Sequence, residues 1–181
     1  MATSAEKIVL GSGYLYCLEF NSGTGIPEDS VIETESNILG YIKGGATVEY
    51  TPTKYTAIDD MGRKSKTITT DEEAHLKSGV MTWNGNTLKK LCATARVTEK
   101  EGKRTVKIGG GVDDGKNYLI RFKHEDKENG NIRVTVVGKN EAGFAIQFAK
   151  DTETVINADF RAMPHDEEGT LILYEEEIAA A

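Results

Sequence analysis

The chain has 181 residues, of which 38% are hydrophobic and 28% are charged, a composition typical of one globular domain spanning residues 1–181. Its 29 acidic and 22 basic residues give a formal charge of −7, which argues against tight binding of nucleic acid through the phosphates. No apolar run is long enough to cross a membrane, and the first residues do not have the pattern of a secretory signal, so we expect synthesis in the cytoplasm.

The first half of the chain predicts two strands separated by a long polar segment. Residues 14–20 are aromatic-rich and predict a strand, whereas residues 21–37 contain two glycines and a proline and predict a loop. Residues 46–51 alternate, which predicts a strand with Ala46, Val48 and Tyr50 facing the core. The other side of this strand is then polar and exposed.

Residues 52–70 form a polar insertion that is too long for an ordinary connection. We expect it to be a functional arm or a mobile loop. It leads into another alternating segment, residues 73–80, whose Ala74, Leu76 and Val80 face one way. Two strands flanking such an insertion predict an extended hairpin. The charged and aromatic residues assigned to this arm are Lys54, Tyr55, Asp59, Asp60, Arg63, Lys64 and Lys66.

The second half predicts one short helix and then more strands. The helix should run from residue 85 or 86 to residue 94, because Asn84 or Asn86 can cap it and apolar residues recur at helical spacing. Period-two alternation then predicts strands around residues 105–108, 118–122, 132–136, 144–148, 156–160 and 171–173. The predicted fold is therefore mainly β: an antiparallel β-sandwich or partly closed β-barrel with one short α-helix and a long hairpin arm.

No motif predicts catalysis, a cofactor or a metal. Cys17 and Cys92 have no pair or partner histidine at ligand spacing, and we interpret them as reduced structural residues. His75, His124 and His165 are scattered singly, without the clustering that a metal site needs. The glycine-rich segments 11–13 and 109–111 lack the continuation of a phosphate-binding loop and are better explained as turns. We therefore expect a protein that is not an enzyme.

A family resemblance is carried by short patches between about residues 39 and 178. These patches resemble the major tail tube proteins of siphophages that infect Gram-positive bacteria. The first-half patches are 39–53 (LGYIKGGATVEYTPT), 60–62 (DMG), 70–73 (TDEE) and 79–84 (GVMTWN), and the later ones are 133–140 (RVTVVGKN), 150–154 (KDTET) and 169–171 (GTL) followed by Glu175 and Glu176.

The resemblance implies a structural protein of the virion tail that is assembled in the host cytoplasm. Six subunits would make a ring, and stacked rings would make a tube that conducts DNA without binding it tightly. The implied partners are other copies of the chain, the tape measure protein, the tail terminator and the distal tail proteins, with no membrane. No cofactor is implied.

Two surfaces follow from combining the strand pattern with this resemblance. Residues 52–70 would be an arm that reaches the next ring, and the sheet edges would pair with neighbouring subunits. The polar faces of the two strands that bound the arm would line the channel. The residues predicted to line it are Thr47, Glu49, Thr51, Glu73, His75 and Lys77.

Other functions stay open at this point. Within the same class, the chain could be the inner tube of a contractile phage tail or of a tail-like bacteriocin. From other classes, it could be a β-barrel that binds a small ligand or a glycan, which should offer exposed aromatics or an apolar cavity. A hydrolase with a cryptic site is the remaining alternative.

Overall fold

The computed structural model describes residues 9–178, and this part of the chain is mainly β. It contains two short α-helices, α1 (Asp29–Ile32) and α2 (Gly85–Leu91), and a 3-10 turn, Glu35–Asn37. The strands are β1 (Gly13–Phe20), β2 (Ile38–Gly40), β3 (Ile42–Ile58), β4 (Ser65–Val80), β5 (Arg96–Lys100), β6 (Lys103–Lys107), β7 (Asn117–His124), β8 (Ile132–Asn140), β9 (Ile156–Ala162) and β10 (Ile172–Glu176).

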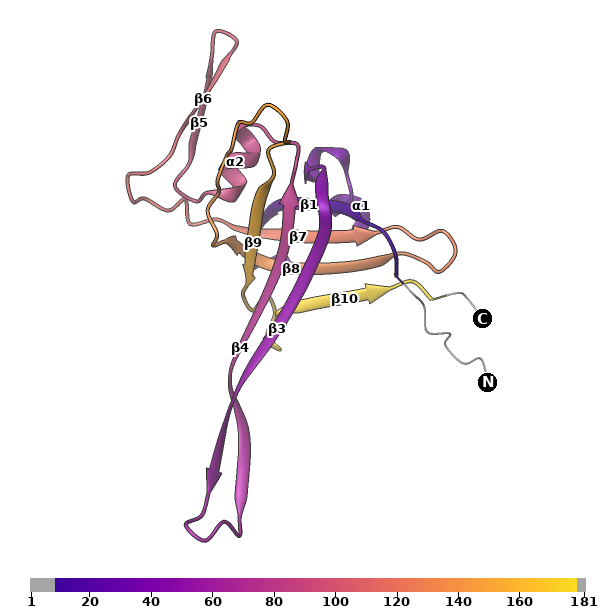
Figure 1. Ribbon diagram of the computed structural model, residues 1–181, viewed down its shortest axis with the longest axis vertical. Coiled ribbons are helices and arrows are strands. Elements are labelled where there is room, and N and C mark those ends of the chain that lie inside the picture. The colour runs from indigo at the N-terminus through magenta and orange to yellow at the C-terminus, as the bar shows by residue number, and fades with distance from the viewer. Residues whose placement is uncertain (1–8, 179–181) are drawn as a thin grey trace.

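Eight strands form one antiparallel sheet in the order β2-β1-β7-β8-β9-β4-β3, with β10 paired to β8. The sheet folds over at β8, which pairs with β10 through residues 132–136 and with β9 through residues 138–140. Strands β7, β8 and β10 therefore cross β3, β4 and β9 at a steep angle (Figure 1). The predicted antiparallel sandwich or partly closed barrel is confirmed.

The main core lies between these two layers. Leu15, Ile120 and Val136 from one layer pack with Leu76 and Phe160 from the other, and all five are almost completely buried. Inward residues alternate with polar ones on β4 and β9, as the period-two pattern predicts. Burial of side chains of this size stabilises the fold by about 1.5 to 3 kcal/mol each.

The predicted loop at residues 21–37 is partly wrong, because it contains α1 and the 3-10 turn. This segment covers the outer face of β1, β7 and β8, where Ile32 is buried in a second cluster with Tyr16, Leu119 and Val137. Only four residues of α1 are helical, too few to show a helical repeat in the sequence. The expectation of a single helix was therefore wrong as well.

A group of ion pairs fixes this covering segment to the sheet. Arg121 of β7 is only 1% exposed, and its guanidinium pairs with Asp29, Glu33 and Glu175. Arg133 Nε donates to Glu33 Oε1 at 2.5 Å. Burial alone would raise the pKa of Glu33, but the hydrogen bonds from Arg133 and Lys123 outweigh it and lower that pKa. Helix α1 and β10 are thus joined to β7 and β8 by charge.

Helix α2 begins where the sequence predicts. Asn84 Oδ1 accepts hydrogen bonds from the backbone N–H groups of Asn86 and Thr87, and Thr87 Oγ1 accepts one from the N–H of Asn84. Leu88 and Leu91 face the core. The helix ends at Leu91 instead of residue 94.

One predicted strand does not exist. Residues 141–155 have no regular structure, and Phe148 is 83% exposed. The Asn140 side-chain amide donates to the carbonyls of Leu91 and Gly143, which fixes an irregular backbone at the end of β8. Phe144 and Ile146 still pack against the core, which explains their apolar alternation. The last strand begins at Ile172, one residue later than predicted.

Strand β5 was missed because its residues, RVTEK, are mostly polar. Within residues 9–178 it pairs only with β6, in a hairpin outside the main sheet that Figure 1 shows beside α2. The hairpin points away from the long arm of β3 and β4.

Candidate functional site

The six residues predicted to line a channel lie on one face of the β3–β4 ribbon. Their cross-strand partners are one another: Thr47 opposes Lys77, Glu49 opposes His75, and Thr51 opposes Glu73. Residues directly opposite in an antiparallel pair point to the same side of the sheet, so the face predicted from alternation exists.

Strand β9 extends this polar face. None of its residues was predicted to line the channel. Lys77 opposes Asp159 and His75 opposes Arg161, whereas Ala158 and Phe160 point into the core. The same alternation that identified the inward residues of β9 could have placed its outward residues on this face. Pairing with β4 could not be predicted, because β9 is about 80 residues away in sequence.

Cations on this face are placed between carboxylates. Lys77 Nζ lies 2.6 Å from Glu49 Oε2 and 3.7 Å from Asp159 Oδ2, and His75 Nδ1 lies 2.7 Å from Asp159 Oδ1. The hydrogen bond to Glu49 raises the pKa of Lys77, which keeps this amine charged.

Arg161 makes the second cationic position on the face. Its guanidinium lies 2.8 Å from Glu73 Oε1 and 3.5 Å from Glu141 Oε1. The network contains two permanent cations, Lys77 and Arg161, and four carboxylates, so its formal charge is −2. The carboxylates are those of Glu49, Glu73, Glu141 and Asp159. The face is therefore acidic, and its cations are already occupied by protein carboxylates.

The predicted arm is a paired ribbon rather than a mobile loop. Strands β3 and β4 stay in register to the pair Ile58 and Ser65, and only residues 59–64 form the turn. Asp59 closes this turn, since its carboxylate accepts from the backbone N–H of Lys64 at 2.5 Å and its own N–H donates to the Lys64 carbonyl at 3.0 Å. The bond from Lys64 lowers the pKa of Asp59.

All seven predicted arm residues lie on this ribbon and are exposed: Lys54, Tyr55, Asp59, Asp60, Arg63, Lys64 and Lys66. None of their charges takes part in an ion pair with another described residue. Tyr55 and Ile68 oppose each other across the ribbon and are 60% and 48% exposed, so the arm also presents apolar surface. The arm has charge and apolar area, and it projects away from the body of the sheet (Figure 1).

A bulge separates the arm from the body of the sheet. Thr53 pairs with Asp71 and Lys54 pairs with Thr69, so Thr70 is an extra residue in β4. Such a bulge increases the twist of a ribbon, and the two strands cross over each other where the arm leaves the body (Figure 1).

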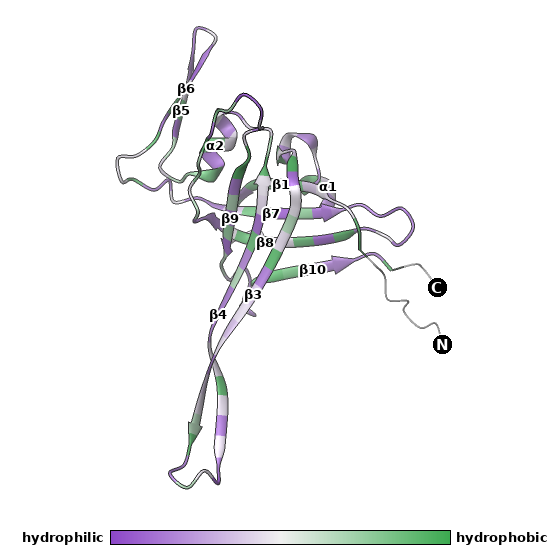
Figure 2. Cartoon of the chain, in the orientation of Figure 1, coloured by the Kyte–Doolittle hydropathy of each residue, from purple (hydrophilic) through white to green (hydrophobic). Residues whose placement is uncertain are grey.

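The sheet also leaves apolar surface uncovered beside its free edge. Among the strands that the structure describes, β3 pairs with β4 alone, on one side. Val48 and Tyr50 point to the same side as the buried Leu76 and Ala74, yet they are 39% and 51% exposed. The prediction that both face the core was wrong because β3 extends past the layer that would cover them. Figure 2 shows apolar and polar residues mixed along this strand.

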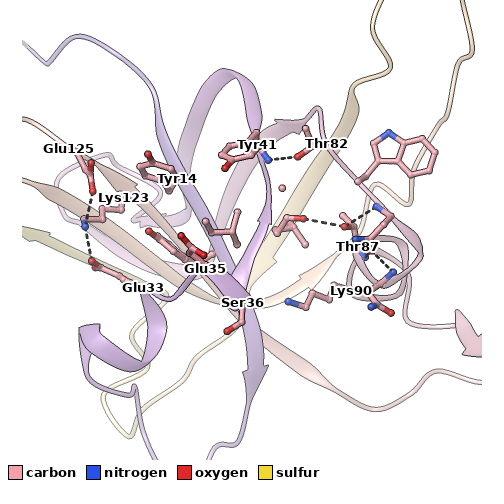
Figure 3. A pocket seen from close by; sticks show the side chains of 17 residues that line it. Tyr14, Glu33, Glu35, Ser36, Tyr41, Thr82, Thr87, Lys90, Lys123 and Glu125 are labelled. Atoms are coloured by element: carbon pink, nitrogen blue, oxygen red, sulfur yellow. Dashed lines mark hydrogen bonds and ion pairs between the residues drawn. The ribbon is translucent and has the colours of Figure 1, made fainter. Parts of the chain in front are cut away.

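A hollow of about 840 Å³ opens between β2, the C-terminal end of β4 and α2 (Figure 3). It is lined by Tyr14, Tyr41 and Trp83 together with charged groups such as Glu35 and Lys90. Lys90 is already bound, since its Nζ donates to the Cys17 carbonyl at 2.5 Å. This grouping of aromatic residues comes from distant segments and was not evident in the sequence.

The described residues contain no group of three or more His, Cys, Asp or Glu side chains arranged to hold a metal ion. The three histidines lie apart: His75 is on the polar face, and His124 Nδ1 donates to the Ser12 carbonyl at 2.8 Å. Cys17 and Cys92 are free thiols, and burial raises the pKa of Cys17 to about 12. Within residues 9–178, no helix is both long and apolar enough to span a bilayer.

No protein-family profile matches the chain, and a comparison with characterised proteins finds no match either.

Proposed function

We propose that the chain is the structural subunit of a bacteriophage tail tube, forming stacked hexameric rings whose acidic channel conducts DNA into the host. One observation carries the proposal most directly: strand β3 has a free edge, an uncovered apolar side at Val48 and Tyr50, and an exposed arm that continues from the same strand. A free edge beside an uncovered apolar side is the kind of surface on which a second chain pairs.

Pairing between copies would complete the free edge of β3 and cover its exposed apolar side. A neighbour beside β3 covers Val48 and Tyr50 and pairs with the free edge, and repetition around a ring leaves no edge exposed. The arm then reaches a copy in the next ring, and because such stacking is heterologous it produces a tube. Contacts with the tape measure protein, tail terminator and distal tail proteins belong to the ends of this tube.

The polar face of β3, β4 and β9 is suited to line the channel. DNA carries one negative charge per about 1.7 Å, so a conducting surface must repel it weakly and offer few available cations. Lys77 and Arg161 are each held between carboxylates and are poor partners for phosphate. This mechanism is passive and needs no catalytic residue.

Electron microscopy of two matched variants tests the proposal. Wild-type protein at high concentration should form rings or tubes as wide as a phage tail. Val48→Lys should remain a folded subunit and form neither, because the charge would be buried at the contact between copies. Val112→Lys, at a 71% exposed position between β6 and β7, is the control and should assemble normally. Uniform small particles of the wild type at every concentration would refute the proposal.

The hollow in Figure 3 favours a second candidate, a glycan-binding protein, since Tyr14, Tyr41 and Trp83 line one opening. Lys123, a cation that lines the hollow, already forms ion pairs within the protein, at 2.9 Å from Glu33 and 3.0 Å from Glu125. Isothermal titration with soluble oligosaccharides distinguishes the two functions. Binding by wild type that is lost in Tyr41→Ala, without any tubes, would support the second one.

A further inference from the structure

The β5–β6 hairpin is a second projecting element, and the proposed function gives it no role. It contacts the rest of the fold mainly through α2. Gly85 allows the hairpin to pack closely against α2, since a Cβ at this position would lie 2.7 Å from Arg104 Cδ and 2.8 Å from Val106 Cγ2. Its turn is also well defined, because Glu101 and Gly102 both have positive φ, as a tight two-residue hairpin turn requires. The hairpin is therefore a preformed element with a fixed base.

The two faces of the hairpin differ completely. Cross-strand pairing puts Val97, Val106, Glu99 and Arg104 on the face that includes the contact with α2. Arg104 is neutralised there by Glu99 at 2.6 Å. The opposite face carries two threonines and four cations and no acidic strand residue: Arg96, Thr98, Lys100, Lys103, Thr105 and Lys107.

These cations oppose each other in pairs. Arg96 lies directly across from Lys107, and Lys100 across from Lys103. Like charges at opposed positions destabilise a two-stranded ribbon. Of these four cations, only Lys100 makes an ion pair with another described residue, its Nζ lying 3.5 Å from Glu101 in the turn. An external anionic surface would remove this repulsion.

The rest of the chain is strongly acidic. Residues 96–107 hold five basic and two acidic residues and therefore have a formal charge of +3. Because the whole chain has a formal charge of −7, the other residues together carry −10. Two carboxylates near the C-terminus are used internally, since Glu175 and Glu177 pair with arginines of the sheet. The loop between β9 and β10 is different, because Glu167 and Glu168 are exposed and make no ion pair with a described residue.

The positions of the two charged elements suit contact between copies. The hairpin projects from the α2 end of the molecule, whereas the β9–β10 loop lies on the side from which the arm leaves (Figure 1). Complementary surfaces on opposite sides of one chain cannot meet within that chain. They meet when copies stack in the same direction, and such contacts generate a filament.

We infer that the basic face of the β5–β6 hairpin docks on the acidic loop around Glu167 and Glu168 of a second copy of this chain. The contact would be separate from the β3–β4 arm, and it rests on the proposed function in that both require self-assembly. The copy is favoured over nucleic acid as the partner because the rest of the chain, from which the hairpin projects, carries a formal charge of −10 and repels phosphates.

A charge exchange tests this contact. Lys103→Glu with Lys107→Glu reverses one side, and Glu167→Lys with Glu168→Lys reverses the other. Each double variant should raise the critical concentration for tube formation about tenfold, as expected for the loss of two or three exposed ion pairs. The quadruple variant, with both sides reversed, should assemble at the wild-type concentration.

Controls separate this inference from the proposed function. Lys127→Glu with Lys150→Glu, at exposed positions, changes the net charge by the same amount as the hairpin double variant and should assemble normally. Double variants that assemble like wild type overturn the hairpin contact while leaving the tube intact. If wild type forms no tubes, sedimentation velocity of the two double variants, mixed and separate, still measures the contact. The inferred contact is overturned in favour of nucleic acid by two results together. The quadruple variant would fail to recover assembly, and the wild-type protein would bind duplex DNA tightly at 150 mM salt.

Discussion

The body of the sheet and the arm are made from the same two strands but are stabilised in different ways. Along residues 74–80, β4 alternates buried and partly exposed side chains and is covered by the β1–β7–β8 layer. Beyond the bulge at Thr70, both strands are paired with each other and with nothing else, and every residue is exposed. Backbone pairing alone is enough to shape a ribbon, but only one part of this ribbon contributes to a core.

This difference teaches that regular structure and stability are separate properties of a segment. An isolated two-stranded ribbon is marginal in water, because it buries little apolar area in return for the conformational entropy that it loses. The arm is therefore expected to respond to contacts outside the subunit, whereas the body responds to its own packing. Three predictions test this contrast, in order of decreasing effect on subunit stability.

The largest effect is expected in the body. Phe160→Ala removes a ring that is 1% exposed at the centre of the two-layer core. It should lower the free energy of unfolding by about 3 to 5 kcal/mol, through lost apolar burial and the cavity left behind. Chemical denaturation followed by tryptophan fluorescence measures the change, since Trp83 packs against the same core. A loss below about 1 kcal/mol would mean that the layers do not meet at Phe160.

An intermediate effect is expected where charge holds β10 to the body. The backbone N–H of Asn131 and then the guanidinium of Arg133 lower the pKa of Glu177 from 4.5 to about 2. A lowered pKa stabilises the fold above the unfolded-state value and loses that contribution as pH falls towards the folded-state value. Wild type should therefore lose stability more steeply than Glu177→Gln between about pH 4.5 and pH 2. Parallel denaturation curves for both proteins across that window would contradict this.

The smallest effect on the subunit, and the largest on assembly, is expected in the arm. Tyr55→Ala removes a side chain that is 60% exposed and lies opposite Ile68 of the same ribbon. The free energy of unfolding should change by less than about 0.5 kcal/mol. Tube formation should be lost, because the proposed contact with the next ring loses its aromatic residue. Phe148→Ala, which removes another exposed aromatic from outside the arm, is the matched control for assembly.

The sequence predicted much of the fold because alternation reports which side of a strand each residue occupies. Ala74, Leu76 and Val80 were placed on one side of their strand in this way, and all three are buried. The same rule grouped Glu49 with His75 on one face before any pairing was known. Alternation does not show whether another layer of the fold covers that side. Val48 lies on the predicted side, but it is 39% exposed because too little of the opposite layer lies above it.

Other elements were missed because their determinants lie elsewhere in the chain. Helix α1 has only four residues and is stabilised through Asp29 and Glu33 by distant arginines. Residues 144–148 alternate like a strand, but they pack side chains on the core without a backbone partner. The hollow beside α2 brings together aromatics from three segments, which no local pattern shows.

A paired ribbon can change its length only in certain steps. One residue added to each strand extends it by about 3.3 Å and turns every later side chain to the opposite side, whereas two added to each strand restore the sides. In this chain Thr70 already provides a single extra residue at the base of the arm, paired with the carbonyl of Thr53 through its own hydroxyl. Insertions beyond that point change the reach of the arm and leave the register of the body untouched. Length differences among natural variants of such a chain should therefore accumulate in even steps between residues 54 and 69.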